Sequence, residues 1–529
     1  MNQRRSYVMS DVSNDEVEYT QEELASIRVR YSTIMNYISE MYRLILAILF
    51  TLVIVRKLTV PEYGLWTTIM GVVSILSGVH SIWCTWSLRY YARKRYDMVS
   101  FAYALTLMYA PLSLAVLLLI GYLYNSILGW GFMAFALASL MLISESFNMF
   151  LRSLILGSRP YIEGRILMVR VTIRLVVAYV LVVLLHIGLL GVVLAVIVCS
   201  SIVALLRYVV MKRNGIVVPK PRMEYGGIGK LLKNSYISLM LYLSNLVINL
   251  DRPMVTALTS TTDLTAYLGV AYIPRNVIVR SSGALSSGLV SKLLRVPSAK
   301  DIEDVLRIAL ILNVGMISLL ITLAKPVLSV FKVAYVSAWL LLVLMGTESL
   351  IYTLTILLGN VASASETADI HAYGLKLIKT PIFKVPMLLF IRGVIALGLG
   401  SAGMIFLLNE GQGRMTDPYA VLPYPIAWVL TGIPLLAYMY MMAKSRVAFS
   451  FPVREFLATL TGSALMALYL ILSNTINIVI REFWRDAPVL VLHALIGLTI
   501  YGTVVLALSP WSREFLKLSI KFVRSREEC

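Results

Sequence analysis

Residues 189–210 read LLGVVLAVIVCSSIVALLRYVV, and this stretch decides the class of fold. No charge occurs in it before Arg207, which leaves a run close to the roughly 20 apolar residues that a helix needs to cross a bilayer. Similar runs recur along all 529 residues, of which 59% are hydrophobic and only 14% are charged. Soluble domains are roughly 25% charged. The sequence therefore predicts an integral membrane protein.

Apolar runs bounded by glycine, proline or clustered charges predict about fourteen transmembrane helices. They cover residues 31–55, 64–88, 99–124, 130–156, 166–187, 189–210, 231–258, 264–291, 305–330, 334–361, 380–407, 421–443, 454–480 and 487–508. Most of the 47 lysine and arginine residues fall in alternate loops. Because cytoplasmic loops are enriched in these residues, both termini are expected in the cytoplasm. The predicted location is the cytoplasmic (plasma) membrane.

The predicted helices form two sets of six, followed by two more. Tyr37-Ile38-Ser39 opens the first set and Tyr236-Ile237-Ser238 opens the second, which indicates an internal duplication. An even number of spans per repeat relates the halves by a pseudo-twofold axis along the membrane normal. We expect two all-α bundles around a central cavity. The predicted division is a cytoplasmic tail (1–30), the first bundle (31–211), a basic cytoplasmic linker (212–230), the second bundle (231–444), helices 13 and 14 (445–508) and a basic cytoplasmic tail (509–529).

The net charge of +19 is explained by the orientation of a membrane protein, so nucleic acid is not an expected partner. Cys84, Cys199 and Cys529 form no CxxC pair, and the four histidines are isolated in the sequence. We therefore expect neither a disulfide framework nor a metal site, and no cofactor. The sequence also lacks a glycine-rich nucleotide-binding loop, so ATP is not expected to drive the protein directly.

Thr59-Val60-Pro61-Glu62 follows the first predicted span and has the pattern of a capping box. In this motif the threonine accepts from the third helical amide while the glutamate reaches back to the threonine amide. Pro61 is tolerated here because the first-turn amides of a helix have no intrahelical partner. The pattern predicts a sharp start of the second span.

Arg56-Lys57-Leu58-Thr59-Val60-Pro61-Glu62-Tyr63-Gly64 resembles the segment between the first two helices of polysaccharide-exporting flippases. These belong to the multidrug/oligosaccharidyl-lipid/polysaccharide (MOP) superfamily. Asp251 followed by Ala266-Tyr267-Leu268-Gly269-Val270-Ala271-Tyr272-Ile273-Pro274 is similar to a second family pattern, with Ala266 where the family has glycine. Arg152 to Arg165 and Gly188 to Val192 are also similar. The resemblance covers about residues 30–300 and implies a transporter of the polysaccharide branch that works by alternating access.

Ionisable residues inside the predicted spans cost about 2.5–3.5 kcal/mol each on insertion scales, so each is a candidate functional residue. The cationic candidates for binding a phosphate in the cavity are Arg275, Arg43, Arg280, Arg170, Arg174 and Arg252. The acidic candidates for ion coupling or gating are Asp251, Glu40, Glu145 and Glu348. Lys384 and Arg392 add two more cations. Because cations outnumber acids, an anionic ligand is expected to complete the balance of charge.

The depth of each charge follows from the helical rise of 1.5 Å per residue. Glu40, Arg43 and Arg275 fall near the midplane. Glu40 and Arg43 lie three residues apart, so they either pair with each other or face the cavity. Arg275 and Arg280 lie five residues apart and cannot point in one direction, and Arg275 is the expected cavity residue.

Two further groups of charges leave alternatives open. Arg170 and Arg174 share a helix face, so either an anion lies beside them or they snorkel to the headgroups. That anion is Glu145 or a ligand phosphate. Asp251, Arg252 and Pro253 either form a bent gate in which Asp251 carries a coupling proton or sodium ion, or contain a structural Asp–Arg pair.

These observations predict a flippase that translocates a lipid-linked oligosaccharide for surface polysaccharide or glycoprotein assembly. The saccharide is carried on a polyprenyl or dolichyl phosphate or pyrophosphate. Arginine suits such a headgroup because its planar fork donates two parallel hydrogen bonds to phosphate. The expected partners are this substrate, membrane lipids and glycosyltransferases of the same pathway. We expect a transporter and not an enzyme.

Two alternatives belong to other functional classes. A multidrug or organic-cation exporter of the same superfamily would need unpaired acids in the cavity, whereas here the balance of charge has the opposite sign. A membrane-embedded glycosyltransferase or polymerase would need acidic or metal-binding residues in a sizeable outer loop. The longest predicted outer loop, about 409–420, has only Glu410 and Asp417.

Overall fold

The computed structural model describes residues 29–92, 94–223, 225–293, 299–364, 378–409 and 417–517. Within these ranges the chain forms α-helices joined by short turns, with brief 3-10 and π segments and no strand. This confirms the prediction of an all-α protein. Most of the two predicted terminal tails lies outside the described residues.

The helices follow the order predicted from hydropathy, and each predicted span overlaps at least one of them. In the first half they are α2 (Val29–Lys57), α3 (Val60–Gly78), α4 (Ser81–Ala92), α5 (Tyr96–Leu128), α6 (Phe132–Ser158), α7 (Pro160–Ala178), η1 (Tyr179–Leu184) and α8 (Gly188–Arg213). The rest are α9 (Tyr225–Thr259), α10 (Asp263–Leu293), α11 (Ala299–Thr322), α12 (Ala324–Phe331), η2 (Val333–Ala338), α13 (Trp339–Ala364), α15 (Pro381–Asn409), η4 (Pro418–Val421), α16 (Pro423–Lys444), α17 (Val453–Leu472), η5 (Thr475–Asn477) and α18 (Phe483–Leu508).

The predicted spans 64–88 and 305–330 are each divided into two helices. α3 and α4 are bent by 46° across the short break between them. α11 ends at Thr322, and α12 follows at once. Pro326 explains the second break, because proline has no amide to donate to the carbonyl of Thr322 and its ring would clash there. The structure therefore differs from the sequence prediction at these two spans.

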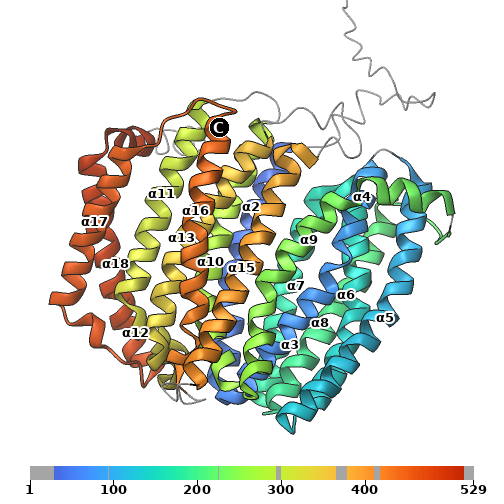
Figure 1. Ribbon diagram of the computed structural model, residues 1–529, viewed down its shortest axis with the longest axis horizontal. Helices are drawn as coiled ribbons and strands as arrows, with labels where there is room; N and C mark the ends of the chain where they lie inside the picture. Colours follow the sequence, from blue (N-terminus) through green and yellow to red (C-terminus); the bar gives the residue numbers. More distant parts are fainter. Residues whose placement is uncertain are drawn as a thin grey trace, which may run out of the picture.

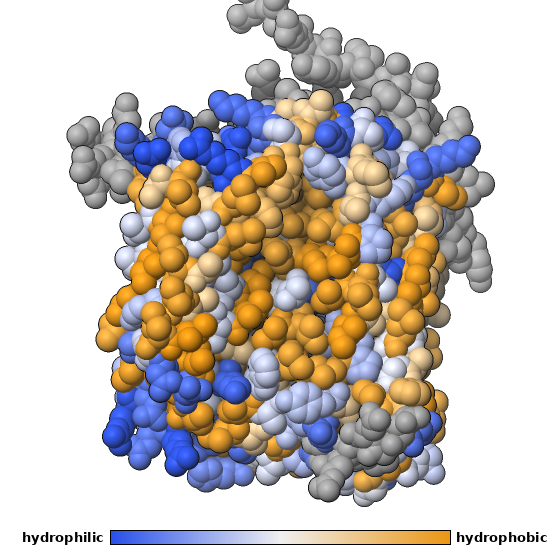
Figure 2. All heavy atoms as spheres, turned by 60° about the vertical axis from the view of Figure 1, so that its left-hand side comes forward, coloured by the Kyte–Doolittle hydropathy of each residue, from blue (hydrophilic) through white to orange (hydrophobic). Residues whose placement is uncertain are grey.

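Among the described residues, ten helices are long and apolar enough to cross a membrane, or eleven if bent α3 and α4 count as one span. The chain is therefore a multi-pass membrane protein. α2, α9 and α10 are not among the ten, although none of them is shorter than 29 residues. These three helices carry much of the predicted intramembrane charge. Figure 2 shows a broad hydrophobic band between two hydrophilic rims, with a hollow in its upper middle.

The predicted capping box at the start of α3 is confirmed. The backbone amide of Glu62 donates to the Thr59 hydroxyl, and the Thr59 amide donates to the Glu62 carboxylate at 2.9 Å. Pro61 lies in the first turn. The motif fixes where α3 begins, so it also fixes which residues of α3 meet the second half of the chain.

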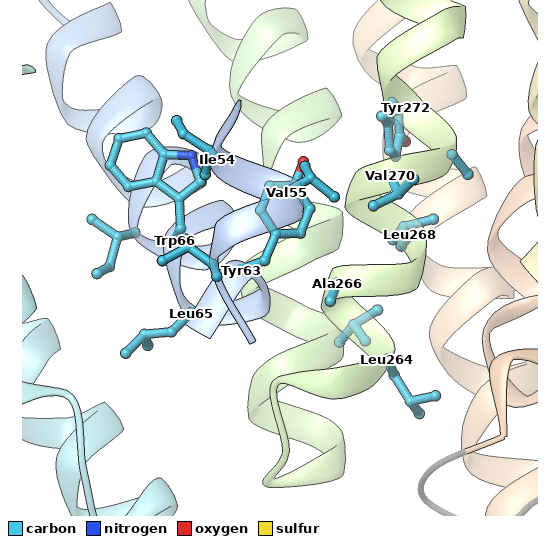
Figure 3. Close-up of a cluster of buried hydrophobic side chains, with 14 of the residues drawn as sticks. Ile54, Val55, Tyr63, Leu65, Trp66, Leu264, Ala266, Leu268, Val270 and Tyr272 are labelled. Atoms are coloured by element: carbon cyan, nitrogen blue, oxygen red, sulfur yellow. The ribbon is translucent and has the colours of Figure 1, made fainter. Parts of the chain in front are cut away.

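The two halves converge at the end of the molecule where α3 begins. Figure 1 shows α5 to α8, on the right, leaning away from the second half toward the top of the view. α3 packs against both α9 and α10. Figure 3 shows side chains of this contact, including Tyr63 and Trp66 on one side and Leu268 and Tyr272 on the other.

Small residues let the backbones of the halves approach closely. A Cβ atom on Gly64 would lie 1.8 Å from the Thr262 carbonyl oxygen, and one on Gly71 would lie 3.0 Å from Pro253 Cδ. Pro253 itself lies inside α9, which runs unbroken from Tyr225 to Thr259. Only glycine permits this separation at position 64, so the closed contact depends on it.

Candidate functional site

The predicted intramembrane charges gather into one group in each half. We name Glu145, Arg170, Arg174 and Ser200 the first-half cluster. We name Asp251, Arg252, Tyr272, Arg275, Glu348 and Arg392 the second-half cluster.

Glu145 on α6 holds the first-half cluster together. Arg170 Nη2 lies 2.5 Å from Glu145 Oε1, and the Ser200 hydroxyl donates to the same oxygen at 2.6 Å. The sequence analysis named Glu145 or a ligand phosphate as the anion beside Arg170 and Arg174. In the structure Glu145 is the anion that contacts Arg170. Arg174 is stacked 4.0 Å above the centre of the Phe50 ring, and its Nε has no hydrogen-bonding partner among the described residues. The cluster thus holds two guanidinium groups and one carboxylate.

Further positive charge lies around Arg174. Arg280, exposed on α10, is close enough to repel the Arg174 guanidinium electrostatically. Arg43 is half-buried on α2, directly after Tyr42, whose hydroxyl lies 2.8 Å from the Thr172 hydroxyl on α7. Cations from both α7 and α10 therefore contribute to the electrostatic field at Arg174.

Glu348 on α13 is shared by two arginines of the second-half cluster. Arg275 Nε lies 2.6 Å from Glu348 Oε2, and Arg392 Nη2 lies 2.9 Å from Glu348 Oε1. Arg392 Nη2 also donates to the Trp428 carbonyl at 2.8 Å. The three charged side chains are 7%, 2% and 1% exposed for Arg275, Arg392 and Glu348. In this conformation Arg275 therefore forms a buried ion pair with Glu348.

Asp251 on α9 is fully buried within the same cluster. It accepts hydrogen bonds from the Tyr272 hydroxyl and, at 2.7 Å, from the backbone amide of Arg252. Arg252 Nε lies 3.8 Å from Asp251 Oδ1, and its guanidinium is stacked 4.8 Å from the centre of the Tyr272 ring. The sequence analysis left two alternatives for these residues, a structural Asp–Arg pair or ion coupling at Asp251. The contacts are those expected of a structural pair.

One further buried ion pair, between Arg207 and Glu163, was absent from the predicted site residues. Arg207 on α8 is 1% exposed, and its Nε and Nη2 contact the two Glu163 oxygens at 3.2 Å and 2.5 Å. Arg207 Nη1 donates to Asn148 Oδ1 at 2.6 Å. The available signal was the charge of Arg207 inside the predicted span 189–210. Glu163 was missed because α7 begins at Pro160, before the predicted start at 166.

Glu40 and Lys384 are the two remaining charged residues predicted inside the spans. Glu40 lies on α2, but its side chain is outside the part of the structure that is described, so its pairing with Arg43 stays a prediction. Lys384 is half-buried on α15.

At the C-terminal end of α2, two cationic side chains form hydrogen bonds between the two halves of the chain. Arg56 Nε donates to the Val330 carbonyl in the last turn of α12 at 2.8 Å, and Lys332 Nζ donates to the Leu58 carbonyl just after α2 at 3.2 Å. We name this pair of bonds the reciprocal clasp. The last carbonyls of a helix lack intrahelical partners and carry the negative end of its dipole. A cation from each half therefore caps the C-terminal end of a helix in the other half.

No protein-family model and no curated protein matches the chain. Solved structures do match it. The lipid II flippase MurJ in an inward closed conformation aligns with a TM-score of 0.62 at 14% identity, over 91% of this chain and 100% of that chain. An inward-facing multidrug resistance transporter of the MATE family in the MOP superfamily aligns with a TM-score of 0.55 at 14% identity, over 78% and 98% of the two chains.

A MOP-superfamily transporter from Pyrococcus furiosus aligns over 78% of this chain and 96% of its own. The TM-score is 0.53 and the identity 14%, and the binding pocket of that transporter is described as having reverse polarity. The chain has the fold of MOP-superfamily transporters. This fold is the one that the resemblance of Arg56 to Gly64 implied.

Proposed function

We propose that the chain is a flippase that carries a lipid-linked oligosaccharide from the inner to the outer leaflet of the cytoplasmic membrane. The observation that carries this proposal is the excess of guanidinium groups where the halves meet. Arg174 on α7 lies beside Arg170, whose partner is Glu145, and forms no ion pair with a described carboxylate, and Arg280, exposed on α10, adds to the positive charge that acts on Arg174. A phosphate or pyrophosphate on a polyprenyl or dolichyl carrier would relieve their repulsion.

The chemistry of arginine supports a phosphate ligand at this position. Two like charges held together inside a membrane protein are costly unless an anion joins them. A phosphate can accept a two-pronged hydrogen bond from each guanidinium. Arg170 contributes less, because Glu145 already neutralises it. A ligand bound between Arg174 and Arg280 would link the two halves of the chain.

The proposed transport cycle is alternating access between two six-helix bundles with both termini in the cytoplasm. The reciprocal clasp would then lie at the outer end, and the described conformation would be closed to the outside. The MurJ structure is that of a lipid II flippase, which supports a substrate built on a lipid carrier. Glycosyltransferases that build the saccharide are the proposed pathway partners.

A flipping assay tests the proposed function and its arginines. In proteoliposomes containing a fluorescent short-chain lipid-linked saccharide, the wild-type chain should deplete the inner-leaflet pool. Arg174→Ala should slow this at least tenfold, because a charge-assisted hydrogen bond contributes about 1.5–3 kcal/mol and about 1.4 kcal/mol is a factor of ten. Arg213→Ala, which removes an exposed arginine from α8, is the control and should flip normally. Unchanged leaflet distribution with folded wild-type protein would contradict the proposal.

The fold of MATE transporters makes a cationic drug the second candidate substrate. The same vesicles, given an organic cation such as a fluorescent dye, measure this directly. We expect no protein-dependent dye transport, because the unpaired charges between the halves are positive and would repel it. Dye transport without saccharide flipping would favour the exporter.

Asp251 is the proposed site of ion coupling. Asp251→Asn keeps the shape of the side chain and removes its charge, so flipping by this variant should no longer respond to a proton or sodium gradient. Flipping rate measured at two imposed gradients checks this expectation. A variant that responds like the wild type, but unfolds at lower temperature, would assign Asp251 to the structural pair with Arg252.

A further inference from the structure

The Arg392 guanidinium on α15 has more donors than the protein uses. Its side chain is 2% exposed, and Nη2 is taken by the Glu348 carboxylate and the Trp428 carbonyl. Arg392 Nε and Nη1 have no hydrogen-bonding partner in the described part of the chain. Buried donors that remain unpaired are rare in folded proteins, and an ion or water commonly accounts for them.

The second-half cluster also carries an unbalanced positive charge. Arg275 and Arg392 share the single carboxylate of Glu348. Asp251 cannot compensate, because it contacts Arg252 and the Tyr272 hydroxyl. Among the described carboxylates, only Glu348 lies within ion-pair distance of Arg392. Three guanidinium groups therefore face two carboxylates, and a charge buried without a partner is strongly unfavourable.

Trp428 on α16 supplies another donor beside Arg392. Its indole is 3% exposed, and its Nε1 has no hydrogen-bonding partner among the described residues. The Arg392 guanidinium lies 5.2 Å from the centre of the Trp428 ring, so the two groups are neighbours. An indole N–H can only donate, as can a guanidinium. The missing partner must therefore be an acceptor.

We propose that Arg392 and Trp428 bind a small monovalent anion, such as chloride, inside the second half. A single negative charge neutralises the cluster and accepts from the unused N–H groups, whereas a water molecule would leave the charge unbalanced. Because the Arg392 side chain is only 2% exposed, the ion must be small enough to lie in the interior of the protein. This inference is independent of the flippase proposal, since Arg392 is not among the arginines assigned to substrate.

The experiment measures thermal unfolding of the full chain in detergent, with chloride replaced by gluconate at constant ionic strength. The wild-type midpoint should rise with chloride to a plateau, and bromide should act like chloride. Arg392→Met should abolish this rise. Trp428→Phe keeps an aromatic side chain of smaller size and removes the N–H, so the chloride concentration for half of the effect should increase several-fold.

Two controls separate this site from other cationic positions. Arg207→Met removes a buried arginine whose nitrogens are all bonded to Glu163 and Asn148, so its chloride response should match the wild type. Arg174→Met removes the arginine of the proposed substrate site and should also leave the response intact. Equal wild-type midpoints in chloride and gluconate, a full response in Arg392→Met, or loss of the response in Arg174→Met would each overturn the proposal.

Bromide provides a test that does not depend on a variant folding. Crystals of the wild-type chain grown in bromide should show an anomalous peak beside Arg392 and Trp428. Absence of a peak there, in crystals that show bromide elsewhere, would overturn the proposal even if Arg392→Met fails to fold.

Discussion

We expect Glu348→Gln to destabilise the folded chain by about 3–5 kcal/mol, the usual cost of removing one partner from a buried ion pair. The substitution keeps the size of the side chain but leaves Arg275 and Arg392 without their shared carboxylate. Both guanidinium groups are almost fully enclosed, so neither can regain the hydration it would have at the surface. The destabilisation should appear as a lower unfolding midpoint in detergent and as faster proteolysis.

A matched control separates burial from the loss of a charge. Glu514→Gln removes an exposed carboxylate near the end of the described chain and should change stability by less than about 0.5 kcal/mol. Adding Arg392→Met to Glu348→Gln should recover part of the loss, because the uncompensated cation is removed as well. Equal midpoints for Glu348→Gln and the wild type would show that Glu348 is not an essential counter-ion.

Gly64→Ala should prevent the two halves from closing at the end that carries the reciprocal clasp. The new methyl group would lie 1.8 Å from the Thr262 carbonyl oxygen, and a backbone atom cannot rotate away as a side chain can. Overpacking typically costs about 1–3 kcal/mol. A cost of that size shifts a two-state equilibrium by roughly five- to 150-fold. Transport should fall accordingly, because the cycle needs the closed contact.

Spin labels at exposed Lys57 and Ser337 measure this opening directly. In a cysteine-free background, the distance between the labels should be longer in Gly64→Ala than in the wild type. Gly398→Ala is the control, because a Cβ there would meet no atom within 4 Å. That variant should keep the wild-type distance. An unchanged distance in Gly64→Ala would mean that the halves close without the glycine.

The positions of the helices could be predicted from hydropathy because crossing a bilayer imposes a minimum apolar length. The capping box was predictable because its two partners, Thr59 and Glu62, are only three residues apart in the sequence. The division between α11 and α12 was also present in the sequence, at Pro326, but a run of apolar residues on both sides concealed it. The bend between α3 and α4 has no comparable proline.

The candidate site was only partly predictable. The sequence identified the charges of both clusters, and it considered Glu145 as a partner of Arg170. The sharing of Glu348 by Arg275 and Arg392 could not be predicted, because α10, α13 and α15 are distant in sequence and meet only in the folded chain. For the same reason Arg275 was expected to face the cavity, whereas the structure encloses it.

The reciprocal clasp has an evolutionary consequence. Its acceptors are main-chain oxygens of Val330 and Leu58, so any residue at those two positions leaves the bonds available. Selection on the contact therefore acts only on the two donors, Arg56 and Lys332, and on where the helices stop. A comparison of distant relatives would show no correlated substitutions between donor and acceptor positions, even though the two halves touch there.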